Sequence, residues 1–177
     1  MSDDRAEKAL GIKDIEFTDK QKLEALQSVA EAIDSKYAPG DIPILLKRGS
    51  GYEAGLYDES LQTITLYDKR GKYTQEAITD WLANADSIYP NHYGGVYVHE
   101  YGHHFSLVEK PDVINKARAV FEGVTDETRA FIRKEVSLYA STDALELAAE
   151  SYTLRQHPDF INLDENVRKF ISNLLGY

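Results

Sequence analysis

The stretch Val96–Val108 reads VYVHEYGHHFSLV, and the rest of the 177-residue chain can be arranged around it. Its apolar and aromatic residues flank three histidines and one glutamate, a pattern that predicts a helix with a largely buried surface. Histidines are poor choices for a buried helix unless another group satisfies them. We therefore expect the polar residues of this helix to have a chemical role.

His99 and His103 are four residues apart in this stretch, and Glu100 follows the first of them. On a helix, residues four apart share a face with Cβ atoms about 5–6 Å apart, so both imidazoles could reach one ion at about 2.0–2.1 Å. Glu100 is turned by about 100° and would border the ion without binding it. The pattern predicts a zinc site with His99 and His103 as ligands and Glu100 as the general base for the metal-bound water.

A catalytic zinc usually has three protein ligands and an open position for water. Glu109 stands where a helix broken at a glycine would bring a third ligand, but Ser106 replaces that glycine, and an unbroken helix would point Glu109 away. The later segment ELAAES offers two carboxylates four residues apart, separated by alanines that would let two helices approach closely. We expect Glu146 to bind the metal and Glu150 to accept a hydrogen bond from a ligand histidine. The alternative is that both are solvated charges on an amphipathic helix.

The other histidines are expected to lie outside the metal site. His104 is turned by about 100° from His103 and fits a helix-face position or one beside the ligands. His92 lies in the loop before the motif, where it could border a cleft. His157 ends the Glu146 helix, where a cation suits the helix dipole.

Composition limits both the chemistry and the partners. The chain has no cysteine, so any metal must be held by His, Asp or Glu. Its 20 Lys and Arg against 30 Asp and Glu give a formal charge of -10, which argues against nucleic acid or an anionic membrane because phosphate contact needs a basic face. The apolar runs are too short to cross a bilayer. A peptide or protein is the expected partner, and neither nucleic acid nor a membrane is.

The periodicity predicts a single α+β domain over residues 1–177, with a helix and a small sheet in a lobe at 1–90 and a helical lobe at 91–177 that carries the zinc site. Strands are expected at 42–46, 52–56 and 62–67, and the alternating strand 62–67 is proposed as the sheet edge on which an extended peptide lies. The predicted helices cover 18–37, 74–85, 96–108, 112–122, 126–134, 144–157 and 163–175. Capping boxes are expected at the first of these helices, from Thr18, and at the last, from Asn162 and Glu165.

The segments HEYGH (99–103), VSLYA (136–140) and ELAAES (146–151) together resemble the gluzincin zinc metallopeptidases typified by the catalytic domain of anthrax lethal factor and by the Pro-Pro endopeptidases. The resemblance covers roughly the last 80 residues and implies a zincin-like fold with one catalytic zinc. In that family a tyrosine seven positions before the ligand glutamate stabilises the oxyanion, and Tyr139 occupies this position. The family usually has aromatic residues between its two glutamates, where this chain has Leu147 and Ala148.

These residues predict a zinc-dependent endopeptidase with the metal on His99, His103 and Glu146, the water activated by Glu100 and the oxyanion held by Tyr139. Two alternatives stay open. One is a metallopeptidase-like zinc-binding assembly or interaction module of a phage particle or larger toxin, and the other is a metal-free helical interaction domain with a coincidental motif. The chain starts without a signal peptide, so we expect a cytoplasmic protein or one delivered within a larger particle or toxin, unless a leader was removed.

Overall fold

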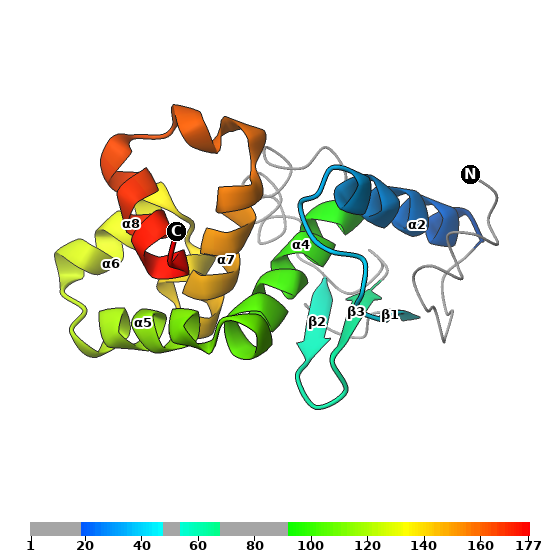
Figure 1. The fold of residues 1–177 in the computed structure, drawn as a ribbon, viewed down its shortest axis with the longest axis horizontal. Coiled ribbons are helices and arrows are strands. Elements are labelled where there is room, and N and C mark those ends of the chain that lie inside the picture. The colour runs from blue at the N-terminus through cyan, green and yellow to red at the C-terminus, as the bar shows by residue number, and fades with distance from the viewer. Residues whose placement is uncertain (1–18, 48–53, 68–91) are drawn as a thin grey trace. The chain divides into compact units, whose positions relative to one another are not determined.

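The computed structural model describes residues 19–47, 54–67 and 92–177. These residues form six α-helices and one three-stranded sheet, so the predicted α+β class is confirmed. The chain divides into two compact units, Met1–Glu100 and Tyr101–Tyr177, which we call the first and second units (Figure 1). The predicted helix at 74–85 and the capping box at Thr18 lie outside the described residues.

The sheet of the first unit has the strand order β1-β3-β2. Its strands are β1 (Ile44–Lys47), β2 (Gly55–Asp58) and β3 (Thr63–Tyr67), and each overlaps one of the predicted strands. The central strand β3 pairs in parallel with β1 and antiparallel with β2. The prediction that the 62–67 strand is a sheet edge is therefore wrong, because β3 uses its backbone hydrogen bonds on both sides.

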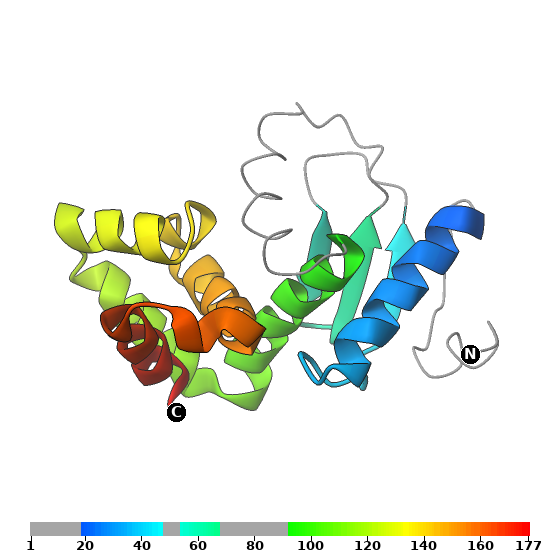
Figure 2. The same cartoon turned by 90° about the horizontal axis from the view of Figure 1, so that it is seen from above.

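Helix α2 (Asp19–Asp34) and the first part of α4 (His92–His104) lie side by side on one face of this sheet (Figure 2). The register places Ile44, Ile64 and Tyr57 in one row on a single face, and all three are buried. The helix α2 ends earlier than predicted because Lys36 adopts a left-handed conformation with φ 60°. Its inward residues are small or aliphatic: Ala25, Leu26, Val29 and Ala32.

Two contacts attach the start of α4 to the rest of the first unit. Gly94 lies so close to α2 that an added Cβ would be 3.0 Å from the carbonyl oxygen of Ser28. The hydroxyl of Tyr97 donates a hydrogen bond of 2.6 Å to the carbonyl oxygen of Pro39. Burial, with a smaller contribution from Asp41, raises the pKa of Tyr97, so the hydroxyl keeps the proton that it donates.

The second unit is a helical bundle built around α7 (Ala144–Gln156). Helices α5 (Pro111–Glu122) and α8 (Glu165–Leu175) both pack against α7, and α6 (Asp126–Glu135) packs on the short turn η2 (Tyr139–Ser141) that precedes it. These four α-helices match the predicted ones to within two residues at each end. Residues on several sides of α7 are buried, as in an interior helix: Leu147, Ala148, Ala149, Ser151, Tyr152 and Thr153.

The start of α8 differs from the prediction. Its N-cap is Asp164, whose carboxylate accepts a hydrogen bond of 2.8 Å from the backbone N–H of Asn166. The predicted capping box from Asn162 is wrong, since Asn162 ends a separate 3-10 turn, η3 (Pro158–Asn162). Proline at the first position of η3 supports that turn and delays the start of the helix.

Helix α4 also ends before the predicted Val108. After His104 the chain forms a π-helical turn, η1 (Phe105–Glu109), closed by a hydrogen bond of 2.7 Å from the Lys110 N–H to the Phe105 carbonyl. Pro111 then begins α5. The wider turn rotates Glu109 away from the position that an unbroken α-helix would give it.

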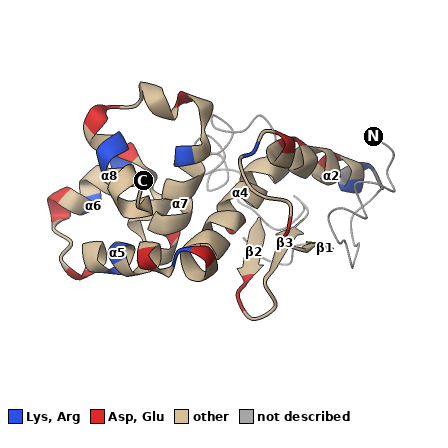
Figure 3. Cartoon of the chain, viewed as in Figure 1, with Lys and Arg blue, Asp and Glu red and all other residues tan. Residues whose placement is uncertain are grey.

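No helix within the described ranges is long and apolar enough to cross a membrane. Acidic residues occur on several helices and in the turn between β2 and β3, and they do not gather on one element (Figure 3).

Candidate metal centre

The structure brings together His99, His103 and Glu146, whose candidate ligand atoms all lie within 4.8 Å of one another. The two histidines are one turn apart on α4, and Glu146 lies in the first turn of α7. The Nε2 atom of His103 is 3.7 Å from Oε1 of Glu146. His99 is buried, while the other two side chains keep some exposure. This cluster could bind a metal ion, as the spacing of the motif predicts.

The donor set suits a divalent metal ion such as zinc, which binds histidine nitrogens and carboxylate oxygens. Two imidazoles and one carboxylate are three ligands, which leaves one position of a tetrahedral ion for water. Ligand atoms at about 2.0–2.1 Å from such an ion are roughly 3.3 Å apart, close to the 3.7 Å between His103 Nε2 and Glu146 Oε1.

A close contact between two helices brings His103 near Glu146. An added Cβ on Gly102 would lie 2.8 Å from both the Cα and the carbonyl oxygen of Ala149. The backbones of α4 and α7 therefore touch beside the cluster, and the prediction that small residues allow a close helix approach is confirmed. The Thr153 hydroxyl donates a hydrogen bond of 2.9 Å to the same Ala149 carbonyl, which satisfies it in this buried place.

The start of α7 holds Glu146 in place through its backbone. Asp143 is the N-cap, and its Oδ1 accepts hydrogen bonds of 2.8 Å from the Leu145 N–H and 3.0 Å from the Glu146 N–H. A negative charge in the first turn of a helix is also favoured by the helix dipole. Local capping by Asp143 therefore orients the turn that carries Glu146.

Glu100 follows His99 on α4 and is buried. Its side chain lies against the first residue of β2, where an added Cβ on Gly55 would be 2.7 Å from the Glu100 Oε1 atom. The carboxylate is thus confined by the backbone of a strand of the first unit. The assignment of Glu100 as general base stays a prediction.

Two further predicted residues lie on or just before α7. Glu150 is one turn beyond Glu146 and half-buried, so the two carboxylates share a face of the helix as expected. Tyr139 opens the turn η2 and is 42% exposed, which leaves part of its ring accessible to a substrate. The proposed roles of Glu150 and Tyr139 stay predictions.

Glu109 belongs to a different group of side chains. Its carboxylate accepts a hydrogen bond from the Tyr101 hydroxyl and has Oε1 3.7 Å from Nε2 of His104. Both Tyr101 and His104 are buried. Sequence reasoning did not find this group, because the residues meet only through the π-helical turn; Lys110-Pro111, which ends the helix, was the available signal.

Of the two remaining histidines, His157 lies outside the cluster. The side chain of His92 is not among the described ones. His157 follows the last residue of α7, and its Nδ1 accepts a hydrogen bond of 3.1 Å from the Asp159 N–H, which caps η3.

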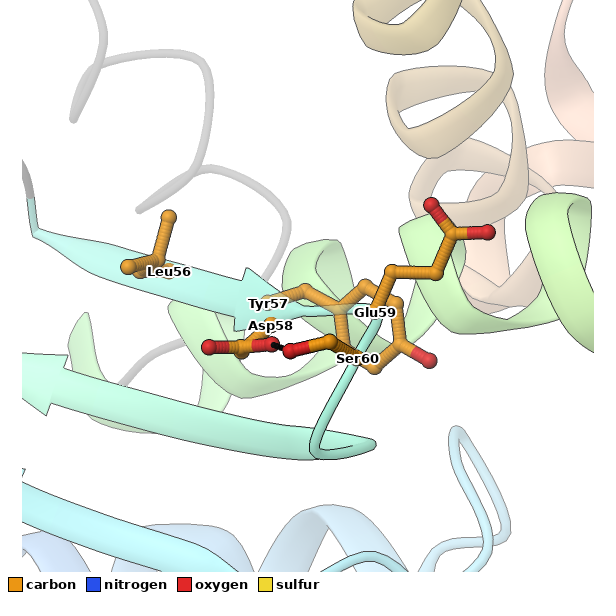
Figure 4. Close-up of a pocket in the computed structure, with 5 residues that line it drawn as sticks. All are labelled: Leu56, Tyr57, Asp58, Glu59 and Ser60. Atoms are coloured by element: carbon orange, nitrogen blue, oxygen red, sulfur yellow. Dashed lines mark hydrogen bonds between the residues drawn. The ribbon is translucent and has the colours of Figure 1, made fainter.

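A hollow also lies at the turn between β2 and β3 (Figure 4), lined by Leu56, Tyr57, Asp58, Glu59 and Ser60. Hydrogen bonds from the Ser60 hydroxyl and the Leu61 N–H lower the pKa of Asp58. Burial, together with the charges of Glu59 and Asp58, raises the pKa of Tyr57. Because its walls are consecutive residues of one hairpin, the hollow lacks the convergent polar groups of a ligand site.

No protein-family model, curated protein or solved structure matched this chain.

Proposed function

We propose that the protein is a zinc-dependent endopeptidase with a zincin-like, gluzincin-type site. The observation that supports this most strongly is the cluster of His99, His103 and Glu146, in which the two histidines of the motif meet a carboxylate from a distant helix. A coincidental HExxH pattern would not be expected to have a carboxylate from another helix within this distance. The resemblance of the motif segments to lethal-factor-like peptidases supports the same conclusion.

Zinc bound by these three residues supplies Lewis acidity toward a water molecule and a peptide carbonyl. Glu100 accepts a proton from the attacking water, whose oxygen bonds to the carbonyl carbon. The Tyr139 hydroxyl donates a hydrogen bond to the carbonyl oxygen as it gains negative charge. The C–N bond then breaks, and Glu100 passes its proton to the amine nitrogen. Glu150 holds the orientation of a ligand imidazole.

The substrate backbone is proposed to lie along β2 rather than along β3. Within the part of the chain that the structure describes, β2 pairs only with β3, so its second side has hydrogen-bonding groups to offer. The first residue of β2 lies against Glu100, which makes this edge the one beside the proposed base. Extended peptides commonly bind by adding to such an edge.

The decisive test combines metal analysis with one substitution. Protein purified without added metal should carry about one zinc per chain by elemental analysis and should cleave members of a peptide library. The Glu100→Gln variant should keep the zinc and lose about 10²- to 10⁴-fold in kcat, because it cannot accept the proton.

A matched control is Glu127→Gln, which makes the same change at an exposed position of α6 and should cleave normally. Zinc binding without cleavage by the unaltered protein would overturn the endopeptidase proposal and favour an assembly or interaction module. If the purified protein carries no zinc, the remaining alternative is a metal-free helical interaction domain.

A further inference from the structure

We propose that Gly55 is a positioning residue for Glu100: its missing side chain leaves the space that the Glu100 carboxylate occupies, and a larger residue would displace the base. The inference rests on the proposed function, which makes Glu100 the proton acceptor. It concerns a residue in β2 that no motif of the sequence singles out.

The space around Gly55 is fully taken. An added Cβ would lie 2.5 Å from Cγ1 of Val96, 2.7 Å from Oε1 of Glu100 and 2.8 Å from Cγ of Glu100. Non-bonded carbon atoms are most favourable at about 3.5–4.0 Å, so the two contacts with carbon atoms would each be short by roughly an ångström. Even alanine therefore collides with both Val96 and Glu100, and each contact must be relieved by a shift.

Glu100 is the more flexible of the two neighbours, and Val96 or the strand must also shift to relieve the third contact. Val96 is 1% exposed and β-branched, and such residues have one strongly preferred rotamer in a helix. The strand is held by its pairing with β3 and by the adjacent hydrogen bond of 2.9 Å from the Tyr67 N–H to the Ala54 carbonyl. The Cγ of Glu100 also collides with the added Cβ. To avoid this collision, the Glu100 side chain must rotate about one of its first bonds, which moves the carboxylate as well.

The backbone itself does not require glycine at this position. Among the described glycines only Gly176 has a positive φ, so Gly55 has a conformation that alanine also adopts. Glycine inside a strand is unfavourable because it loses more conformational freedom on folding than alanine does. Its presence in β2 is explained by the close approach of Glu100 and Val96.

The expected consequence is a loss of rate without a loss of metal. A general base must lie within about 2.6–3.2 Å of the proton it accepts, and a misplacement of about 1 Å can cost roughly 10²-fold. Gly55→Ala should therefore lower kcat by about 10²-fold, with the zinc content unchanged and KM changed much less.

A double-mutant cycle separates positioning from a general structural role. If Gly55 acts through Glu100, adding Gly55→Ala to the Glu100→Gln variant should not lower its residual kcat further. An equal fold-loss in both backgrounds would overturn the inference, as would an unchanged kcat in Gly55→Ala alone.

A second double-mutant cycle measures the same contact by urea unfolding, and it does not require the protein to cleave a peptide. The Glu100→Ala change removes two of the three collisions, so Gly55→Ala should lower the unfolding midpoint more in the original background than in the Glu100→Ala background. Equal shifts would overturn the inference even if the chain cleaves no peptide, whereas absence of cleavage by the unaltered protein tests the proposed function alone.

Gly40→Ala is the matched control. An added Cβ at Gly40 would lie 2.9 Å from Cδ1 of Ile33, a similar collision with an aliphatic side chain. This variant should keep its kcat and shift the unfolding midpoint equally in both Glu100 backgrounds.

Discussion

The shortest glycine contact that helix α4 makes in the first unit differs in kind from the one it makes in the second unit. In the second unit Gly102 brings helix backbone against the backbone of Ala149, while in the first unit Gly55 brings strand backbone against the side chains of Val96 and Glu100. A side chain can rotate away from a collision, but a helix backbone cannot. We therefore expect the Gly102 contact to set the separation of the candidate ligands His103 and Glu146, and the Gly55 contact to set the position of Glu100.

This difference assigns separate effects to the two units. Disturbing the helix contact should weaken metal binding, because His103 and Glu146 lie on the helices that it joins. Disturbing the strand contact should leave the metal in place and slow the reaction. The following predictions test how far that division holds.

The largest of these effects should come from Tyr139→Phe. Tyr139 belongs to the second unit but is proposed to act in catalysis, so its loss should slow the reaction without weakening metal binding. Loss of an oxyanion donor commonly lowers kcat about 10²- to 10³-fold. Steady-state cleavage kinetics should show this loss with the zinc content unchanged. Tyr177→Phe removes the same hydroxyl from an exposed tyrosine and should have normal kinetics. A normal rate in Tyr139→Phe would exclude its catalytic role.

A smaller effect is expected for Gly102→Ala, which changes the contact between α4 and α7 itself. The added methyl group must push α4 and α7 apart, so His103 and Glu146 separate and zinc affinity should fall by about 10- to 100-fold. Competition with a chromophoric chelator measures this affinity. The unfolding free energy should also fall, by about 1–3 kcal/mol, as for other overpacked cores.

Gly123→Ala is the control for that variant, since the nearest atom to an added Cβ there is the Ala119 carbonyl oxygen, 3.8 Å away. Its zinc affinity should be unchanged. If Gly102→Ala also binds zinc normally, the helix contact does not set the ligand separation.

The smallest effect should come from Asp58→Asn, at a hairpin turn that takes part in neither glycine contact. Hydrogen bonds lower the pKa of folded Asp58, so its carboxylate stabilises the fold above the ordinary aspartate pKa of about 3.9. That stabilisation is lost as the pH falls through the lower pKa of the folded state. The variant should unfold at a slightly lower temperature than the original at neutral pH, and the difference should vanish in acid. A difference independent of pH would contradict this origin.

Local patterns predicted much of the second unit. The apolar periodicity of α5, α6 and α8 indicated their bounds closely, because each helix buries one face and its hydrogen bonds join near neighbours. The predicted N-cap of α8 was wrong because Asn162, Asp164 and Glu165 are close together and each is a residue type found at the start of helices. Only the 3-10 turn that uses Asn162 decides between them.

Pairing between distant segments was harder to predict. The alternation in 62–67 indicated a strand but carries no information on its neighbours, so the central position of β3 was missed. The group formed by Tyr101, His104 and Glu109 was missed for a related reason. A single π-helical turn changes which side chains meet, and the residue types around it also fit an ordinary α-helix.

The sequence by itself determined that His99 and His103 share a face of one helix, because a spacing of four residues is a property of the helix alone. It also restricted any metal ligands to His, Asp and Glu, since the chain has no cysteine. Only the tertiary structure decided that Glu146 completes the cluster and that Gly55 borders Glu100. These contacts join segments far apart in the chain, and their distances are set by how closely backbones pack, which the order of residues does not state.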